Sequence, residues 1–78
     1  MNQQLIFNND FAYNQARQAI TFSCLVSGLK VTCYIGVAKD RSPELALAEV
    51  IQQAFSWEDS AEQAIADDAY NSAGEIWL

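Results

Sequence analysis

The stretch QAITFSCLVSGLKVTCYIGV, residues 18–37, is the part of the chain around which we expect the rest to pack. Two runs of alternating residues, 18–26 and 29–37, flank Ser27-Gly28, and such a pair is typical of a two-residue hairpin turn. On the apolar side the predicted pairs are Val26 with Leu29, Cys24 with Val31, Phe22 with Cys33 and Ile20 with Ile35. Because a slip by one residue would turn every side chain to the other face, the agreement between turn and pattern supports this hairpin.

The other side of the predicted hairpin is mixed in character. It carries Ala19, Thr21, Ser23 and Leu25 opposite Lys30, Thr32, Tyr34 and Gly36. We expect no remaining element of the chain to cover this side. Leu25, Thr32 and Tyr34 are therefore candidate residues at the centre of an exposed surface, where another protein or a second copy of the chain would dock.

A first helix is predicted over residues 43–54. Ser42 is a typical N-cap, Pro43 suits the first helical position, and Glu44 places a carboxylate near the positive end of the helix. The apolar face of this helix would consist of Leu47, Val50, Ile51 and Ala54, with Leu45 lying off it.

A second helix is predicted over residues 57–69. Ser56 is a candidate N-cap, and carboxylates follow shortly after it. The apolar face would consist of Trp57, Ala61, Ala64 and Ile65. Since the two predicted helices are separated by only a short bend, a single bent helix over residues 43–70 is the alternative.

Both ends of the chain carry short apolar runs that predict strands. Residues 5–7 read LIF and precede three residues that favour turns. Residues 75–78 read EIWL, and leaving this tail in water would forfeit several kcal/mol of burial at about 25 cal/mol per Å². Residues 11–14 show no clear periodicity, and no element is predicted there.

These elements indicate one domain over residues 1–78. We predict an α+β fold with a small antiparallel sheet of about four strands, built on the hairpin 18–37. Two helices packed on one face of this sheet would bury every apolar run in the chain. A chain of this size needs most of its apolar side chains for folding.

Charge is unevenly distributed along the chain, whose net charge is −6 at pH 7. All four basic residues lie in the first 41 positions, whereas residues 42–78 hold eight acidic residues and no basic one. Nucleic acid and anionic membranes require Lys and Arg, so we expect neither as a partner. Glu58 and Glu62 share one face of the second helix and are candidate residues for contact with a basic protein. A solvated face that keeps a small protein in solution is the alternative.

The sequence carries no sign of export or of a membrane span. Residues 1–4 lack the basic and long apolar segments of a signal peptide. No apolar run approaches the roughly 18 residues that a membrane-spanning helix needs. We therefore expect a cytoplasmic protein with reduced thiols.

Residues for common catalytic chemistry are scarce. The chain has no histidine, which is the commonest general base and metal ligand, and its three glycines are isolated, so no phosphate-binding loop is present. Cys24 and Cys33 would be diagonal neighbours, with Cα atoms about 7–8 Å apart, which is too far for a disulfide. We expect no metal, no cofactor and no catalytic residue.

Residues 22–33, FSCLVSGLKVTC, resemble the hairpin of a family of short proteobacterial proteins catalogued as domain of unknown function 1488. That family shows Phe, often Pro, a small residue and Leu-Val, then Asn-Gly or Asp-Gly, and later an apolar residue with Thr-Cys. Tyr13-Asn14 and the terminal Ile76-Trp77-Leu78 extend the resemblance over nearly the whole chain. The chain departs from the family at Ser27, where Asn or Asp is commoner, and at Ser23, where Pro is frequent and a serine leaves an extra backbone donor. Since the family has no assigned activity, the resemblance implies no catalytic or binding residue.

Three functional hypotheses follow from the sequence. The first is a non-enzymatic protein-binding or regulatory module that uses the mixed sheet face or the acidic helices. The second is a thiol-dependent enzyme or redox protein that uses Cys33 or Cys24. The third is an acidic mimic of nucleic acid that binds a basic protein. We favour the first, because reactive cysteines need an electropositive and partly exposed setting that the sequence does not supply.

Overall fold

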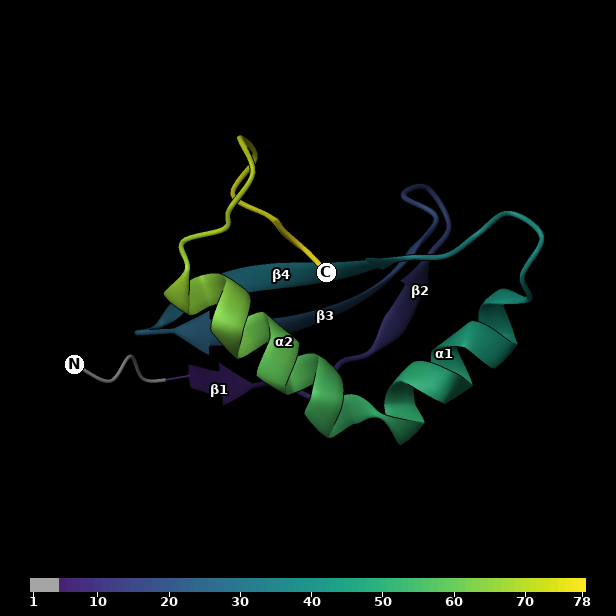
Figure 1. The fold of residues 1–78 in the computed structure, drawn as a ribbon, viewed down its shortest axis with the longest axis horizontal. Helices are drawn as coiled ribbons and strands as arrows, with labels where there is room; N and C mark the ends of the chain where they lie inside the picture. The colour runs from purple at the N-terminus through teal and green to yellow at the C-terminus, as the bar shows by residue number, and fades with distance from the viewer. Residues whose placement is uncertain (1–4) are drawn as a thin grey trace.

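A computed structural model describes residues 5–78, and within them two helices lie over one face of a five-stranded sheet (Figure 1). The elements in chain order are β1 (Leu5–Phe7), β2 (Ala12–Asn14), β3 (Ala19–Val26), β4 (Leu29–Gly36), α1 (Pro43–Gln52), α2 (Ala54–Ala66) and β5 (Ile76–Trp77). The predicted α+β class, with two helices on one face of a small sheet, is confirmed. Residues 1–4, which the predicted domain included, lie outside the described part of the chain.

The β3–β4 hairpin forms with the predicted register. Every predicted pair is present, starting with Val26 opposite Leu29 at the turn. The turn residues Ser27 and Gly28 have φ angles of 51° and 88°. A type I′ turn requires two such positive angles, and its twist matches that of the flanking strands. The local sequence is therefore sufficient to set the register.

The sheet is mixed, and one of its strands is not predicted by the sequence. β1 and β2 pair antiparallel with β3, on residues 24–26 and 19–21 respectively. The sequence of β2 shows no alternation, and β2 pairs with the end of β3 that β1 does not cover. β5 pairs parallel with β4, since the two helices carry the chain back across the sheet between these strands. The sheet is thus mostly antiparallel, with one parallel edge.

The apolar side of the hairpin forms the floor of the core, and both helices cover it. The buried helical residues are Ala46 and Val50 in α1 and Ala61 and Ile65 in α2. The predicted apolar face of α2 is confirmed, because its other two members also pack against this core. The predicted face of α1 is partly wrong, since Ile51 is 51% exposed. Successive residues point about 100° apart on a helix, and α1 turns the side of Ala46 and Val50 to the sheet.

α1 and α2 are separate helices that meet at Gln53. Ser42 caps α1 as predicted, and its side chain accepts a hydrogen bond from the backbone three residues further on. α1 was predicted over residues 43–54 and ends two residues earlier, at Gln52. α2 was predicted over residues 57–69, and both its first and its last residue lie three positions earlier than predicted. Ser56 consequently lies inside α2 and does not cap it, because the chain resumes a helical path directly after Gln53.

The turn makes a direct prediction about glycine. We expect Gly28→Ala to lower the free energy of unfolding by about 1–2 kcal/mol, because a Cβ strains the backbone at φ 88°. A Cβ at this position would meet nothing within 4 Å, so the cost is conformational. Gly36→Ala is the matched control, since it is equally open but lacks the positive φ. Equal stability of the two variants in urea unfolding would contradict the turn assignment.

Candidate functional site

The two faces of the sheet differ in what covers them. α1 and α2 lie on one face, and we call the other the helix-free face (Figure 1). The strand registers place on it the residues Ile6, Ala12, Asn14, Ala19, Thr21, Ser23, Leu25, Lys30, Thr32, Tyr34, Gly36 and Trp77. This is the face that the sequence predicts as an exposed interaction surface.

Tyr34 is not exposed, and the expectation that it forms the centre of an open surface is wrong. Its exposed fraction is 9%. β5 lies beside β4 and places the Trp77 ring on the Tyr34 ring, with centroids 4.7 Å apart and planes inclined by 14°. The guanidinium carbon of Arg17 lies 4.8 Å from the Tyr34 centroid and covers it further. The exposed aromatic residue at this position of the surface is therefore Trp77, which is 42% exposed, and not Tyr34.

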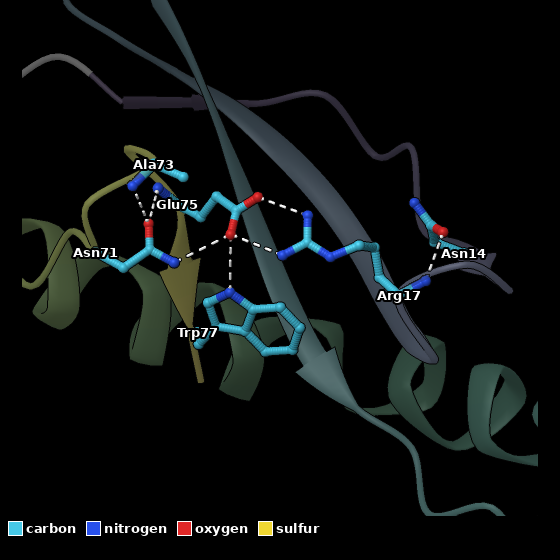
Figure 2. Close-up of polar contacts among 6 residues, drawn as sticks. All are labelled: Asn14, Arg17, Asn71, Ala73, Glu75 and Trp77. Carbon is cyan, nitrogen blue, oxygen red and sulfur yellow. Dashed lines mark hydrogen bonds and ion pairs between the residues drawn. The ribbon is translucent and has the colours of Figure 1, made fainter.

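An ion pair ties the C-terminal strand to the start of the hairpin (Figure 2). Arg17 donates from Nη1 and Nη2 to the two carboxylate oxygens of Glu75, at 2.8 and 2.9 Å. Oε1 of Glu75 also accepts from Nδ2 of Asn71 at 3.0 Å and from Nε1 of Trp77 at 3.1 Å. Arg17 lies 5.4 Å from the Trp77 ring centroid as well. We call Arg17, Tyr34, Asn71, Glu75 and Trp77 the Arg17 cluster.

The electrostatics of the cluster favour a charged Glu75. The hydrogen bonds from Arg17, then those from Asn71 and Trp77, hold the pKa of the Glu75 carboxyl well below its ordinary value of 4.5. Bidentate pairs between arginine and a carboxylate are directional as well as strong. The position of Trp77 is therefore determined by ring stacking and by its hydrogen bond to a carboxylate that is itself fixed.

Arg17 and Glu75 each lie in a turn that an asparagine side chain orders. Oδ1 of Asn14 accepts from the backbone N–H of Arg17 at 3.1 Å, which orders the turn that carries this arginine. Oδ1 of Asn71 accepts from the backbone N–H groups of Ala73 and Glu75, both at 2.9 Å. Asparagine is suited to such turns because its side chain bonds the backbone two or more residues further on. The cluster joins two locally ordered turns from opposite ends of the chain (Figure 2).

A second polar group on this face replaces missing strand pairing. Along β3, β1 pairs with residues 24–26 and β2 with residues 19–21, so neither strand pairs with Ser23. The connection between β1 and β2 runs beside this residue. Oδ1 of Asp10 accepts from the Ser23 backbone N–H at 2.8 Å, and Oδ2 accepts from its Oγ at 2.5 Å. Asn8 donates to the same Oγ at 2.9 Å. The extra backbone donor that the sequence leaves at Ser23 is thus satisfied by Asp10. Burial opposes ionisation of Asp10, but the hydrogen bonds from Ser23 outweigh it and lower the pKa.

The residues predicted to form an interaction surface do not all lie together. Leu25 and Thr32 lie on the helix-free face and are partly buried. Glu58 and Glu62 lie on α2, in the other layer of the molecule. The structure therefore divides the predicted set into two surfaces, one on the sheet and one on the helices.

Sequence reasoning missed two exposed apolar residues on the helix-free face. Ile6 pairs with Leu25 and is 50% exposed, and Trp77 is 42% exposed. The alternation of residues 5–7 is a signal for Ile6, because its two neighbours turn to the core. The sequence carries no comparable signal for Trp77, since its side depends on the parallel register of β5 with β4.

The two cysteines lie on the apolar face as predicted. Both are unpaired and buried, with an exposed fraction of 0%. Burial raises the pKa of the Cys33 thiol to about 12, with the neighbouring Cys24 as a further cause. Burial also raises the pKa of Cys24. A thiolate is therefore disfavoured at both positions near neutral pH, which counts against a nucleophilic role.

Two kinds of feature are absent from residues 5–78. No helix in this part of the chain is long and apolar enough to cross a membrane. No three histidine, cysteine or acidic side chains within it are grouped so that they could hold a metal ion.

Comparison with known proteins gives one consistent family. A family model described as "Protein of unknown function (DUF1488)" matches residues 5–78. The uncharacterized protein YrdB of Escherichia coli K12 is 27% identical over 100% of this chain and 99% of its own length, and that of Shigella flexneri is 26% identical. A crystal structure of a DUF1488 protein of unknown function from Shewanella loihica PV-4 is 30% identical, with a TM-score of 0.87 over 100% of this chain and 94% of that one.

The Glu75 carboxyl predicts an acid-sensitive contribution to stability. Its folded-state pKa is lowered, so the contribution is complete above about pH 4.5, the ordinary value, and is lost as the pH falls below it. We expect Glu75→Gln to unfold at lower urea concentration near neutral pH and to lose less stability between about pH 7 and about pH 3. Glu62→Gln, at an exposed site on α2, is the control. An unchanged acid dependence in Glu75→Gln would show that the ion pair does not stabilise the fold.

Burial of the cysteines predicts low thiol reactivity. In the native protein we expect maleimide to modify Cys24 and Cys33 at least about 100-fold more slowly than in denaturing urea, because the thiolates are disfavoured and shielded. Leu45→Cys supplies a matched exposed thiol, since Leu45 is 65% exposed. Native cysteines that react as fast as this introduced thiol would revive the thiol-dependent hypothesis.

Proposed function

The chain belongs to the DUF1488 family of proteins of unknown function, and from this premise we propose that it is a non-enzymatic protein-binding module. Its helix-free face contacts another protein or a second copy of the chain. The observation that carries this proposal is Trp77, a large aromatic side chain that is 42% exposed and yet held in one position. A cytoplasmic location, expected from the sequence, is part of the proposal.

The setting of Trp77 supports a role as an anchor for a partner. Tryptophan, tyrosine and arginine are the residues that most often dominate the energy of protein interfaces. Here the indole stacks on Tyr34, donates to Glu75 and lies against Arg17. A side chain ordered before binding loses little conformational entropy on binding, which favours affinity.

The rest of the helix-free face extends this anchor into a surface. Ile6 and Leu25 form an apolar pair towards the hairpin turn, with Lys30 opposite Leu25 on β4. Thr32 lies on β4 between this pair and the Arg17 cluster. The surface thus has an apolar patch at one end, an aromatic one at the other and polar groups between them. Such a mixture is typical of interfaces between proteins that also exist apart.

Three features support the non-enzymatic part of the proposal. The chain has no histidine to act as a general base. Both thiols are buried, and their pKa values are raised. The Glu75 carboxyl has a strongly lowered pKa, because it accepts hydrogen bonds from three side chains, and it is held in its charged form.

The acidic helices supply the alternative docking surface. Phe55 is 85% exposed on α2, and Glu58, Asp59 and Glu62 follow it on the same side at i+3, i+4 and i+7. An exposed aromatic side chain beside carboxylates suits a basic partner. The third hypothesis, an acidic mimic of nucleic acid, also requires a basic partner. This surface lies in the opposite layer from Trp77, so variants separate the two possibilities.

A pair of charge-introducing variants tests the proposal. We expect Ile6→Lys to weaken binding and Phe55→Lys to leave it intact, because both add one charge at an exposed apolar site but on opposite layers. Light scattering over a range of concentrations measures self-association. Affinity capture with the tagged chain as bait, followed by measurement of the purified partner's Kd, covers another protein. For Ile6→Lys, in the apolar patch of this surface, a loss of about 10-fold or more in affinity is expected.

Two results would contradict the sheet-face proposal. If Phe55→Lys loses the partner while Ile6→Lys retains it, the acidic helices form the interface. If the wild-type chain is monomeric at all concentrations and no captured protein distinguishes the two variants, the module has no partner on either layer. Unfolding in urea, compared with wild type, verifies that each variant is folded.

A further inference from the structure

The charges of the molecule are divided unequally between the helix-free face and the rest of the chain. Within residues 5–78, the charged side chains at this face are those of Asp10, Arg17, Lys30 and Glu75, and their charges sum to zero. The remaining two basic and eight acidic residues carry the whole net charge of −6. They lie on the two helices and in the segments next to them. The helix-free face is therefore neutral, whereas the helix layer is strongly negative.

This division favours one way for two copies of the chain to meet. Contact through the helices would bring two negative layers together, and like charges repel. Contact through the helix-free faces joins two neutral surfaces and leaves the helices on the outside (Figure 1). Three layer spacings of about 10 Å then hold the two negative layers about 30 Å apart, which exceeds three Debye lengths at physiological salt. A second copy can thus approach the helix-free face without strong repulsion.

One row of residues across the face has a small side chain at one edge and large rings at the other. Ala12 of β2 pairs with Thr21 of β3, which pairs with Tyr34 of β4, and Trp77 of β5 follows. Ala12 is exposed, and Trp77 is 42% exposed. A two-fold axis along β3 would exchange the two edges. The stacked rings of Tyr34 and Trp77 in one copy would then lie against the methyl group of Ala12 in the other.

The charged groups of the face favour the same axis. Asp10 lies beside Ser23 at the edge formed by β1 and β2, and Thr32 lies opposite Ser23 on β4. Exchange of the edges places Asp10 of each copy beside Thr32 of the other, whose hydroxyl can donate to it, with Lys30 one row away. An axis across the strands would instead place Asp10 against its own copy and Lys30 near Arg17. The axis along β3 therefore keeps like charges apart.

The size of the face determines how strong such a contact is. β3 and β4 each contain eight residues. Eight residues of strand are about 26 Å long, and four strand positions span about 19 Å. Two such faces together bury about 1,000 Å², just below the roughly 1,200–2,000 Å² of stable complexes. A contact of this size corresponds to a reversible dimer with a Kd of about 10–100 μM.

We propose that two copies of this chain form a weak two-fold dimer through their helix-free faces, with the axis along β3. The rings of Tyr34 and Trp77 in each copy pack on Ala12 of the other, and Leu25 meets Leu25 at the axis. This inference rests on the sheet-face proposal and narrows its partner to a second copy. Trp77 is the anchor, because the Arg17 cluster already orders it, and Ala12 is the position that receives it.

Two matched variants test the dimer in solution. Light scattering between about 1 μM and about 1 mM should show the wild-type mass rising towards twice that of one chain. Ala12→Arg should raise the Kd at least about 10-fold, because a charged side chain fills the space that receives the rings. Ala48→Arg makes the same change at an exposed alanine on α1, in the opposite layer, and should dimerise as wild type does.

An NMR experiment on the wild-type chain tests the arrangement without any variant. In an equal mixture of isotope-labelled and unlabelled chain, we expect intermolecular NOEs between the Trp77 indole of one copy and the Ala12 methyl group of the other. Within one copy these two residues lie at opposite edges of the sheet, with β3 and β4 between them. This measurement decides the proposal even where Ala12→Arg does not fold.

Three results would overturn the dimer. The first is a wild-type chain that stays monomeric up to about 1 mM. The second is loss of dimerisation in Ala48→Arg but not in Ala12→Arg, and the third is a dimer that lacks the NOEs between Trp77 and Ala12. If the chain is monomeric and a captured protein still loses affinity with Ile6→Lys, the sheet-face proposal stands and only the choice of a second copy fails.

Discussion

The antiparallel register of β3 and β4 is the constraint on which the rest of this structure depends. It puts one set of side chains towards the helices and the alternate set on the helix-free face. Because the side-chain period of a strand is two, a slip by one residue would turn the cysteine of the shifted strand away from the core. β1, β2 and β5 pair with the two strands of the hairpin, and the helices cover its apolar face.

The two ends of the fold are joined by a contact between distant parts of the chain. Arg17 and Glu75 are 58 positions apart in the sequence and form a bidentate pair. It lies beside β5, which is held at the edge of β4 by its strand pairing and by the buried side chain of Ile76, and Trp77 stacks on Tyr34 next to it. The same pair also orders the aromatic group that we propose as the anchor for a partner. Stability and recognition are thus linked on the helix-free face.

The two layers of the molecule carry different chemistry. The helix-free face has Arg17 and Lys30 among aromatic, aliphatic and hydroxyl groups, whereas the helices carry acidic residues and no basic one. Arg41, in the connection between β4 and α1, pairs with Glu49 of α1 on the helix side of the sheet. A fold shared with a DUF1488 relative at a TM-score of 0.87 offers a setting in which both surfaces can be compared.

The sequence by itself determined the hairpin, its register, the Ser42 cap, the apolar face of α2 and the burial of both cysteines. These features depend on residues close in sequence, whose period and turn chemistry carry the information. Only the tertiary structure decided that β2 is a strand, that β5 is parallel, that Asp10 satisfies Ser23 and that Tyr34 is covered by Trp77 and Arg17. Each of these depends on partners far apart in sequence, and neither periodicity nor propensity specifies which distant segments meet.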